Sequence, residues 1–234
     1  MKTFSFILLT AFSVMAGTLR AGEPSSGKDL TPLALPVECD ECLSYDFIDL
    51  KYGINDFGTD FHNDGDFYEA GFTKSVGKRF YVNGSYADGS YRLDTFLNYT
   101  GVKTKRYRMG AGYRQKIADC VDLTFEGGAD YLDTAYGRCG CMDFDSWGSY
   151  FGPGIRARSG RFEMYANAYY TSREGDYSQR YLGYLTPEAL GVDEDGWLFA
   201  AGVVYHLTQN IGLTAGGEWG ELDDVYTFGV RVEF

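Results

Sequence analysis

Long apolar runs and basic residues are both scarce in this chain. After residue 21, no segment has the roughly 18 consecutive apolar residues that a helix needs to cross a bilayer. The 21 Lys and Arg residues stand against 33 Asp and Glu, and the formal net charge is −12. Proteins that bind nucleic acids carry basic patches for the phosphates, so this acidic composition excludes nucleic acid as a partner. Only 5 prolines occur, which leaves long segments free to form strands.

Aromatic residues and glycine, in contrast, are abundant. Phe, Trp and Tyr make up 17% of the residues, and 31 residues are glycine. Aromatic side chains favour strands, and glycine allows tight turns between them. The composition therefore predicts an all-β fold with many turns.

The N-terminus has the pattern of a secretory signal peptide. A basic start precedes an apolar run from Phe4 to Ala16, and small residues lead to Ala21. We predict a signal peptide over residues 1–21, with cleavage after Ala16 as the alternative. Residues 22–44 contain three of the five prolines and little periodicity, so we predict an extended periplasmic lead-in there.

Residues 45–234 show the rhythm of a β-barrel, most clearly in the final segment Val225–Phe234. There, apolar side chains alternate without interruption with polar or small ones, so that one face of a strand is apolar. The same pattern recurs upstream and predicts an antiparallel up-and-down transmembrane barrel of about ten strands, with eight as the alternative. The expected strands are 45–54, 66–76, 79–90, 102–115, 121–132, 147–158, 161–172, 196–208, 211–220 and 225–234.

The connections between these strands alternate between short and long. Residues 55–65, 91–101, 133–146 and 173–195 are the expected long loops. Bacterial outer-membrane barrels have short periplasmic turns and long external loops, whereas a soluble sandwich has no reason to sort its loops in this way. The alternation therefore favours a membrane barrel with both termini on the periplasmic side.

Aromatic residues gather near both ends of the expected strands. Trp147, Trp197 and Trp219 lie at the outer ends, and Phe80, Tyr113, Phe162, Tyr205 and Phe234 lie near the inner ends. Aromatic girdles at the two headgroup levels are typical of transmembrane barrels.

The chain resembles the small outer-membrane barrels of the OmpA- and opacity-protein-like group. The resemblance rests on the strand and turn rhythm, on segments such as Tyr68–Phe72 (YEAGF) and Phe80–Tyr86 (FYVNGSY), and on the terminal Phe234. It implies a location in the bacterial outer membrane, in contact with lipid and lipopolysaccharide. It also implies that the last strand, with Phe234, is an assembly signal for the barrel-assembly machinery.

Charged residues of both signs fall on the inward faces of the expected strands. If the fourth hairpin pairs Arg114 with Asp122, it also pairs Arg106 with Asp130, and the next turn places Arg156 opposite Glu163. The expected interior charge network comprises Arg106, Arg108, Arg114, Asp122, Glu126, Asp130, Arg156, Glu163, Arg231 and Glu233. Side chains of this length should fill a narrow lumen.

Five cysteines follow the signal peptide. Cys39 and Cys42 form a C-x-x-C pair in the lead-in, Cys139 and Cys141 form a C-x-C pair in an external loop, and Cys120 lies in a periplasmic turn. An exported chain favours disulfides, with these two pairs as candidates and Cys120 left over. The pairs fall on opposite sides of the membrane, so their spacing predicts no zinc site.

Two histidines are the remaining candidates for chemistry. His62 lies in the first external loop among acidic residues, and His206 faces inward near the periplasmic end of its strand. Neither position predicts a catalytic or cofactor site. We therefore interpret the chain as a non-catalytic barrel with a structural or surface-interaction role. A narrow passive pore is the alternative, and an outer-membrane hydrolase or acyltransferase is third.

Overall fold

A computed structural model describes residues 42–56, 65–95, 98–136, 142–177, 194–220 and 224–234. The predicted signal peptide and most of the predicted lead-in lie outside these residues, as does His62. Among the described residues, no helix is long and apolar enough to cross a membrane.

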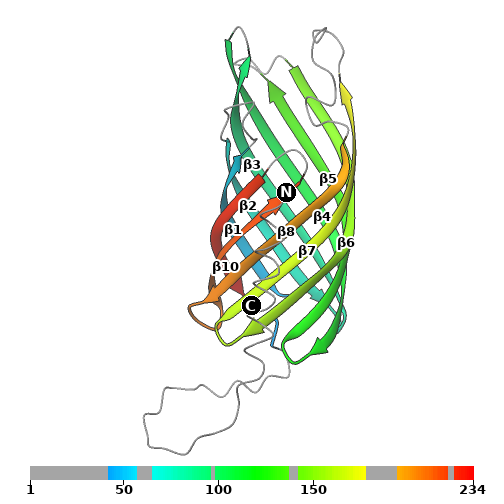
Figure 1. Cartoon of the computed structure of the whole chain (residues 1–234), viewed down its shortest axis with the longest axis vertical. Helices are drawn as coiled ribbons and strands as arrows, with labels where there is room; N and C mark the ends of the chain where they lie inside the picture. The colour runs from blue at the N-terminus through cyan, green and yellow to red at the C-terminus, as the bar shows by residue number, and fades with distance from the viewer. Residues whose placement is uncertain (1–41, 57–64, 96–97, 137–141, 178–193, 221–223) are drawn as a thin grey trace, which may run out of the picture. The chain divides into compact units, whose positions relative to one another are not determined.

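Ten strands form a single closed sheet (Figure 1). Each strand predicted from the sequence is present, with ends shifted by a few residues. The strands are β1 (Phe47–Asp56), β2 (Gly65–Val76), β3 (Phe80–Thr95), β4 (Asn98–Ala118), β5 (Val121–Tyr136), β6 (Met142–Ser159), β7 (Phe162–Tyr177), β8 (Glu194–His206), β9 (Ile211–Trp219) and β10 (Asp224–Glu233).

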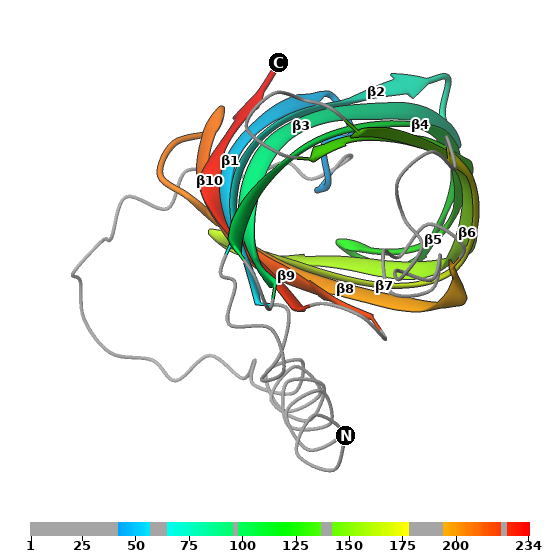
Figure 2. The same ribbon diagram turned by 90° about the horizontal axis from the view of Figure 1, so that it is seen from above.

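The ring is closed by the first and last strands. Each strand pairs with its sequence neighbours, and β1 pairs antiparallel with β10 from Phe47 opposite Glu233 to Asp56 opposite Asp224. Figure 2 shows β10 beside β1 in the end-on view. A closed ring leaves no strand edge unpaired, which is the condition for a sheet to lie in lipid. The predicted fold class, an all-β antiparallel barrel of ten strands, is confirmed.

The two ends of the barrel differ. Four short turns lie at the end where β1 begins and β10 finishes, which we call the turn end; two of them contain Gly77 and Gly160, whose φ of 72° and 60° suits glycine. The strands on either side of the five other connections meet the opposite end of the barrel, the loop end; residues 57–64, 96–97, 137–141, 178–193 and 221–223 of these connections lie outside the described residues.

Two predictions of long loops, at 91–101 and at 133–146, are wrong. β3 and β4 pair as far as Thr95 opposite Asn98, and β5 and β6 pair as far as Tyr136 opposite Met142. The prediction failed because these segments lose the apolar alternation of a lipid-facing strand. Backbone pairing needs no such alternation, so the hairpins continue beyond the apolar part of the barrel.

The outer face of the barrel is apolar and carries two aromatic belts. Met109, for example, is 68% exposed and Phe125 is 54% exposed. Towards the loop end, ring contacts join Tyr86 to Tyr107, Tyr107 to Tyr131, Tyr131 to Trp147 and Tyr170 to Trp197. Towards the turn end, Phe80 contacts Tyr113 and Phe162 contacts Tyr205. An exposed apolar band of this extent, bounded by aromatic belts, is the surface of a transmembrane barrel.

Deletion of Phe234 should lower the amount of folded barrel. The Phe234 backbone N–H donates to the Asp46 carbonyl at 3.0 Å, and Lys74 Nζ lies 5.0 Å from the centroid of its ring, so the deletion loosens the closing strand. We expect the full chain to migrate differently on gels before and after boiling, with a smaller unboiled folded fraction for the deletion. Equal folded fractions would show that Phe234 is not part of the assembly signal. Identical migration of the boiled and unboiled full chain would contradict the barrel fold.

Candidate functional site in the charged interior of the barrel

Buried and half-buried charges line the inner face of the barrel in two groups. The turn-end cluster contains Asp49, Arg156, Glu163, His206, Arg231 and Glu233, all buried. The loop-side cluster contains Arg106, Arg108, Asp130, Arg173 and Glu218. Both arise because the inward position recurs at every second residue of a strand.

Glu163 is at the centre of the turn-end cluster and is fully buried. Its Oε1 accepts hydrogen bonds from Arg156 Nε at 2.8 Å and from Arg231 Nη1 at 2.9 Å. The predicted register is wrong, because Arg158 and not Arg156 is the Cα partner of Glu163. Arg156 nevertheless forms the ion pair, since a long side chain reaches a diagonal neighbour on the same face.

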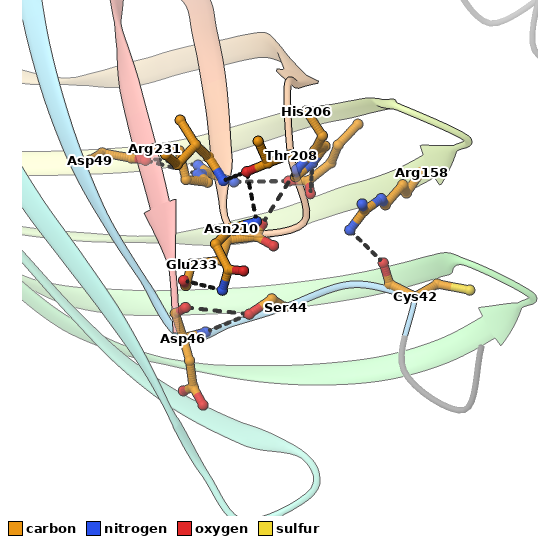
Figure 3. Close-up of polar contacts among 12 residues, drawn as sticks. Cys42, Ser44, Asp46, Asp49, Arg158, His206, Thr208, Asn210, Arg231 and Glu233 are labelled. Atoms are coloured by element: carbon orange, nitrogen blue, oxygen red, sulfur yellow. Dashed lines mark hydrogen bonds and ion pairs between the residues drawn. The ribbon is translucent and has the colours of Figure 1, made fainter. Parts of the chain in front are cut away.

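Arg231 links the closing strands of the ring. Its Nε and Nη2 donate to the two carboxylate oxygens of Asp49 at 2.8 and 2.9 Å, and Nη1 donates to Glu163. The bidentate geometry on Asp49 is the strong form of such a pair. One guanidinium therefore joins β10 to its neighbour β1, where Figure 3 shows Arg231 beside Asp49. It also joins β10 to β7, three places along the ring.

Two aromatic rings contact the guanidinium groups at this level. Arg231 Cζ lies 3.7 Å from the Phe47 ring centroid, and Arg156 Cζ lies 5.1 Å from it. Arg156 also lies 4.5 Å from the Tyr45 centroid, and Arg114 lies 4.6 Å from the same ring. These cation–π contacts stabilise the buried guanidinium groups, and Glu163 Oε1 offsets the repulsion between Arg156 and Arg231.

The polypeptide just before β1 crosses the turn end of the lumen, and we call residues 42–46 the strap. Leu43 and Tyr45 are buried and pack with Tyr81 of β3. The Cys42 carbonyl accepts a hydrogen bond from Arg158 Nη1 at 3.3 Å (Figure 3). At the other end of the strap, the Ser75 backbone N–H donates a hydrogen bond to Asp46 Oδ1 at 2.7 Å. This hydrogen bond is the main cause that lowers the pKa of Asp46.

A disulfide fixes the strap, and it differs from the predicted cysteine pairs. Cys42 is bonded to Cys120 in the turn between β4 and β5, with 4.9 Å between their Cα atoms. Cys39, Cys139 and Cys141 lie outside the described residues. The short spacing in sequence favoured a bond between Cys39 and Cys42. The strap instead places Cys42 next to Cys120, the cysteine for which the sequence predicted no partner.

The loop-side cluster joins opposite walls of the barrel. Asp130 Oδ2 lies 3.1 Å from Arg106 Nη2 and 2.7 Å from Arg173 Nη2. Glu218 on β9 lies 3.4 Å from Arg108 Nη1 and 3.7 Å from Arg106 Nη1, both on β4. β4 and β9 are five places apart in the ring of ten in either direction. The Arg108–Glu218 contact therefore spans the lumen.

The β4–β5 register was also predicted wrongly. Asp130 is the Cα partner of Arg108, not of Arg106, and Thr124 is the partner of Arg114. The offset is two residues, because the turn follows Ala118, which pairs with Val121, and because the register then shifts by one residue between Lys116 and Ala118.

Of the two ion pairs predicted from that register, one forms. The Arg106–Asp130 pair forms diagonally. The pair Arg114–Asp122 is not among the ion pairs of the described residues. Arg114 Nε instead donates to the Lys78 carbonyl at 3.0 Å, and Glu126 accepts a hydrogen bond from the Tyr81 hydroxyl at 3.1 Å.

The sequence did not predict every member of the interior charge network. Asp49, Arg173 and Glu218 belong to the network, and His206 lies within it. The inward side of Asp49, Glu218 and His206 was readable from the strand pattern, whereas Arg173 was expected in the loop 173–195. The partners of these residues were not readable, because contacts across the lumen depend on ring size and on the stagger between strands.

Comparison with known proteins identifies no family. No protein-family model matches the chain, and no curated protein matches it. The translocator domain of the autotransporter NalP from Neisseria meningitidis is 11% identical, with 83% of this chain and 90% of that chain covered and a TM-score of 0.47. OprG from Pseudomonas aeruginosa is 13% identical, with 82% and 96% covered and a TM-score of 0.42. Likeness at this level assigns no function.

Replacement of Cys120 by Ser should destabilise the barrel and free the strap. The bond joins residues 78 positions apart in sequence, and loss of such a crosslink typically lowers the free energy of unfolding by about 2–4 kcal/mol. We expect a lower midpoint in denaturant and faster protease cleavage near Leu43. The matched control is Ser159→Ala, a small exposed residue at the neighbouring turn, which should change neither. An unchanged cleavage pattern in the Cys120 variant would show that the disulfide does not hold the strap.

Proposed function

We propose that this chain is a non-catalytic β-barrel of the bacterial outer membrane, with a filled interior and a structural or surface-interaction role. The single observation that carries the proposal is the contact of Glu218 with Arg106 and Arg108, because it joins opposite walls of the ring. A lumen crossed in this way at its charged level leaves little room for a continuous water path.

Other side chains cross the interior at other heights, which supports the same proposal. Tyr150 and Tyr169 meet edge to face with centroids 5.5 Å apart and pack with Ala200. The Tyr150 hydroxyl donates to Asn83 Oδ1 at 3.4 Å, three strands away in the ring. At the turn end, the strap and Phe47 fill the mouth. Barrels of about eight strands are filled by side chains, and ten strands with long charged residues approach that regime.

The membrane assignment follows from the outer face. Large apolar side chains stay exposed around the barrel, and the burial of each in lipid is favourable by roughly 1.5–3 kcal/mol. The closed β-barrel is the form in which strands cross the outer membrane of bacteria. The predicted export signal, the contact with lipopolysaccharide and the recognition by the barrel-assembly machinery fit this location.

A surface role is favoured over a purely structural one by the hairpins that project beyond the aromatic belt. β4 continues from Tyr107 to Asn98, and β5 continues from Tyr131 to Tyr136. The exposed outward positions Lys103 and Lys105 on this extension are charged, so it lies in water and not in lipid. Rigid strands outside the membrane present a fixed surface to a partner.

Conductance in planar bilayers tests the proposal. The unmodified chain should show little or no conductance, since charged pairs obstruct its lumen. The double variant Arg106→Ala and Arg108→Ala should conduct, because it removes both β4 partners of Glu218. Arg79→Ala is the control, since it removes one positive charge from an exposed turn. Steady, large channels from the unmodified chain would overturn the proposal and favour a passive pore.

A further inference from the structure

Four buried polar atoms meet in the turn-end cluster without a hydrogen-bond partner among the described residues. They are Oε2 of Glu163, both ring nitrogens of His206 and Oε1 of Glu233. The exposed fractions of the three side chains are 0%, 2% and 7%. A buried polar atom left unsatisfied destabilises a fold by about 1–3 kcal/mol. The nearest approaches among these atoms are 3.4 Å between His206 Nε2 and Glu163 Oε2 and 4.0 Å between His206 Nδ1 and Glu233 Oε1.

The three side chains lie close enough together to hold one metal ion between them. One ligand atom from each can be chosen so that all lie within 4.8 Å of one another. His206 Nε2 is 3.4 Å from Glu163 Oε2. Ligands bound tetrahedrally to zinc at about 2.0–2.1 Å lie about 3.4 Å apart, so this distance fits one edge of such a site.

We propose that Glu163, His206 and Glu233 bind a divalent transition-metal ion, with zinc as the best-fitting ion. One imidazole and two carboxylates are ligands that zinc accepts, and three protein ligands leave a fourth position for water. Calcium and magnesium favour sites made of oxygen atoms, so the histidine argues against them. The ligands come from β7, β8 and β10, at the turn end of the barrel.

The arginines beside the site orient its ligands. Arg156 and Arg231 both donate to Oε1 of Glu163, which leaves Oε2 directed at His206. Such hydrogen bonds to a ligating carboxylate fix its orientation toward the metal. Glu233 is held by its backbone, since its carbonyl accepts from Asn210 Nδ2 at 2.9 Å (Figure 3).

Glu233 is the carboxylate of the cluster that lacks a guanidinium partner among the described ion pairs. Asp49, Glu163 and Glu233 carry three formal negative charges, and Arg156, Arg231 and Lys51, whose Nζ lies 3.9 Å from Asp49, carry three positive ones. The three cations pair with Asp49 and Glu163. A divalent ion beside Glu233 pairs with this carboxylate and satisfies the free ligand atoms at the same time. The cysteine and histidine spacings do not predict this site, because its ligands come from β7, β8 and β10 and meet only in the folded barrel.

Zinc titration by calorimetry tests the site. The parent is the full chain with Cys39→Ser, Cys139→Ser and Cys141→Ser, so that free thiols do not bind the metal. It is folded in detergent and treated with chelator before the titration. One zinc ion should bind per chain and raise the melting temperature. Glu233→Gln and His206→Ala should each weaken binding at least tenfold. Glu218→Gln, which removes a half-buried carboxylate from the loop-side cluster, should bind zinc like the parent, and magnesium should not bind.

Two results would overturn the site. One is the absence of zinc binding to the folded parent chain. The other is equal zinc affinity in the parent, His206→Ala and Glu233→Gln variants. X-ray absorption on the zinc-loaded parent chain gives an answer that does not depend on the variants folding. A shell of nitrogen and oxygen with one imidazole is expected, and a shell without imidazole would contradict the assignment.

Discussion

Complete pairing of the backbone is the constraint on which this structure depends. In lipid, an unpaired N–H or C=O group has no water to bind, so the sheet must close on itself. The pairing of β1 with β10 satisfies this constraint. The same closure forces every second side chain into a narrow interior, and this is why charged residues of opposite sign face one another there.

The strongest interior contacts lie beside the seam of the ring. Arg231 comes from the closing strand and holds Asp49 of the opening strand through two hydrogen bonds. The strap before β1 adds Tyr45 next to this layer and is fixed by the bond of Cys42 to Cys120. Removal of one partner from a buried pair typically destabilises a protein by about 3–5 kcal/mol, so these contacts resist opening of the ring between β1 and β10.

The sequence predicted the barrel well because period-two alternation is a local property that each strand carries by itself. It predicted the inward face of Arg156 and Glu163 for the same reason. It did not predict the register, because the shift between Lys116 and Ala118 changes the pairing of β4 with β5 without any mark in the alternation. Contacts such as Arg108 with Glu218 join residues 110 positions apart and depend on the number of strands and their stagger. The ends of β3 to β6 were missed because strands outside lipid need no apolar face.

A double-mutant cycle on Arg108 and Glu218 tests most directly whether side chains bridge the lumen. The free energy of unfolding is measured for the parent, Arg108→Ala, Glu218→Ala and the double variant in the same detergent. A direct contact across the lumen predicts that the two effects are not additive, with a coupling of about 0.5–3 kcal/mol. Effects that add to within about 0.3 kcal/mol would show that the two walls do not interact, and would contradict a filled interior.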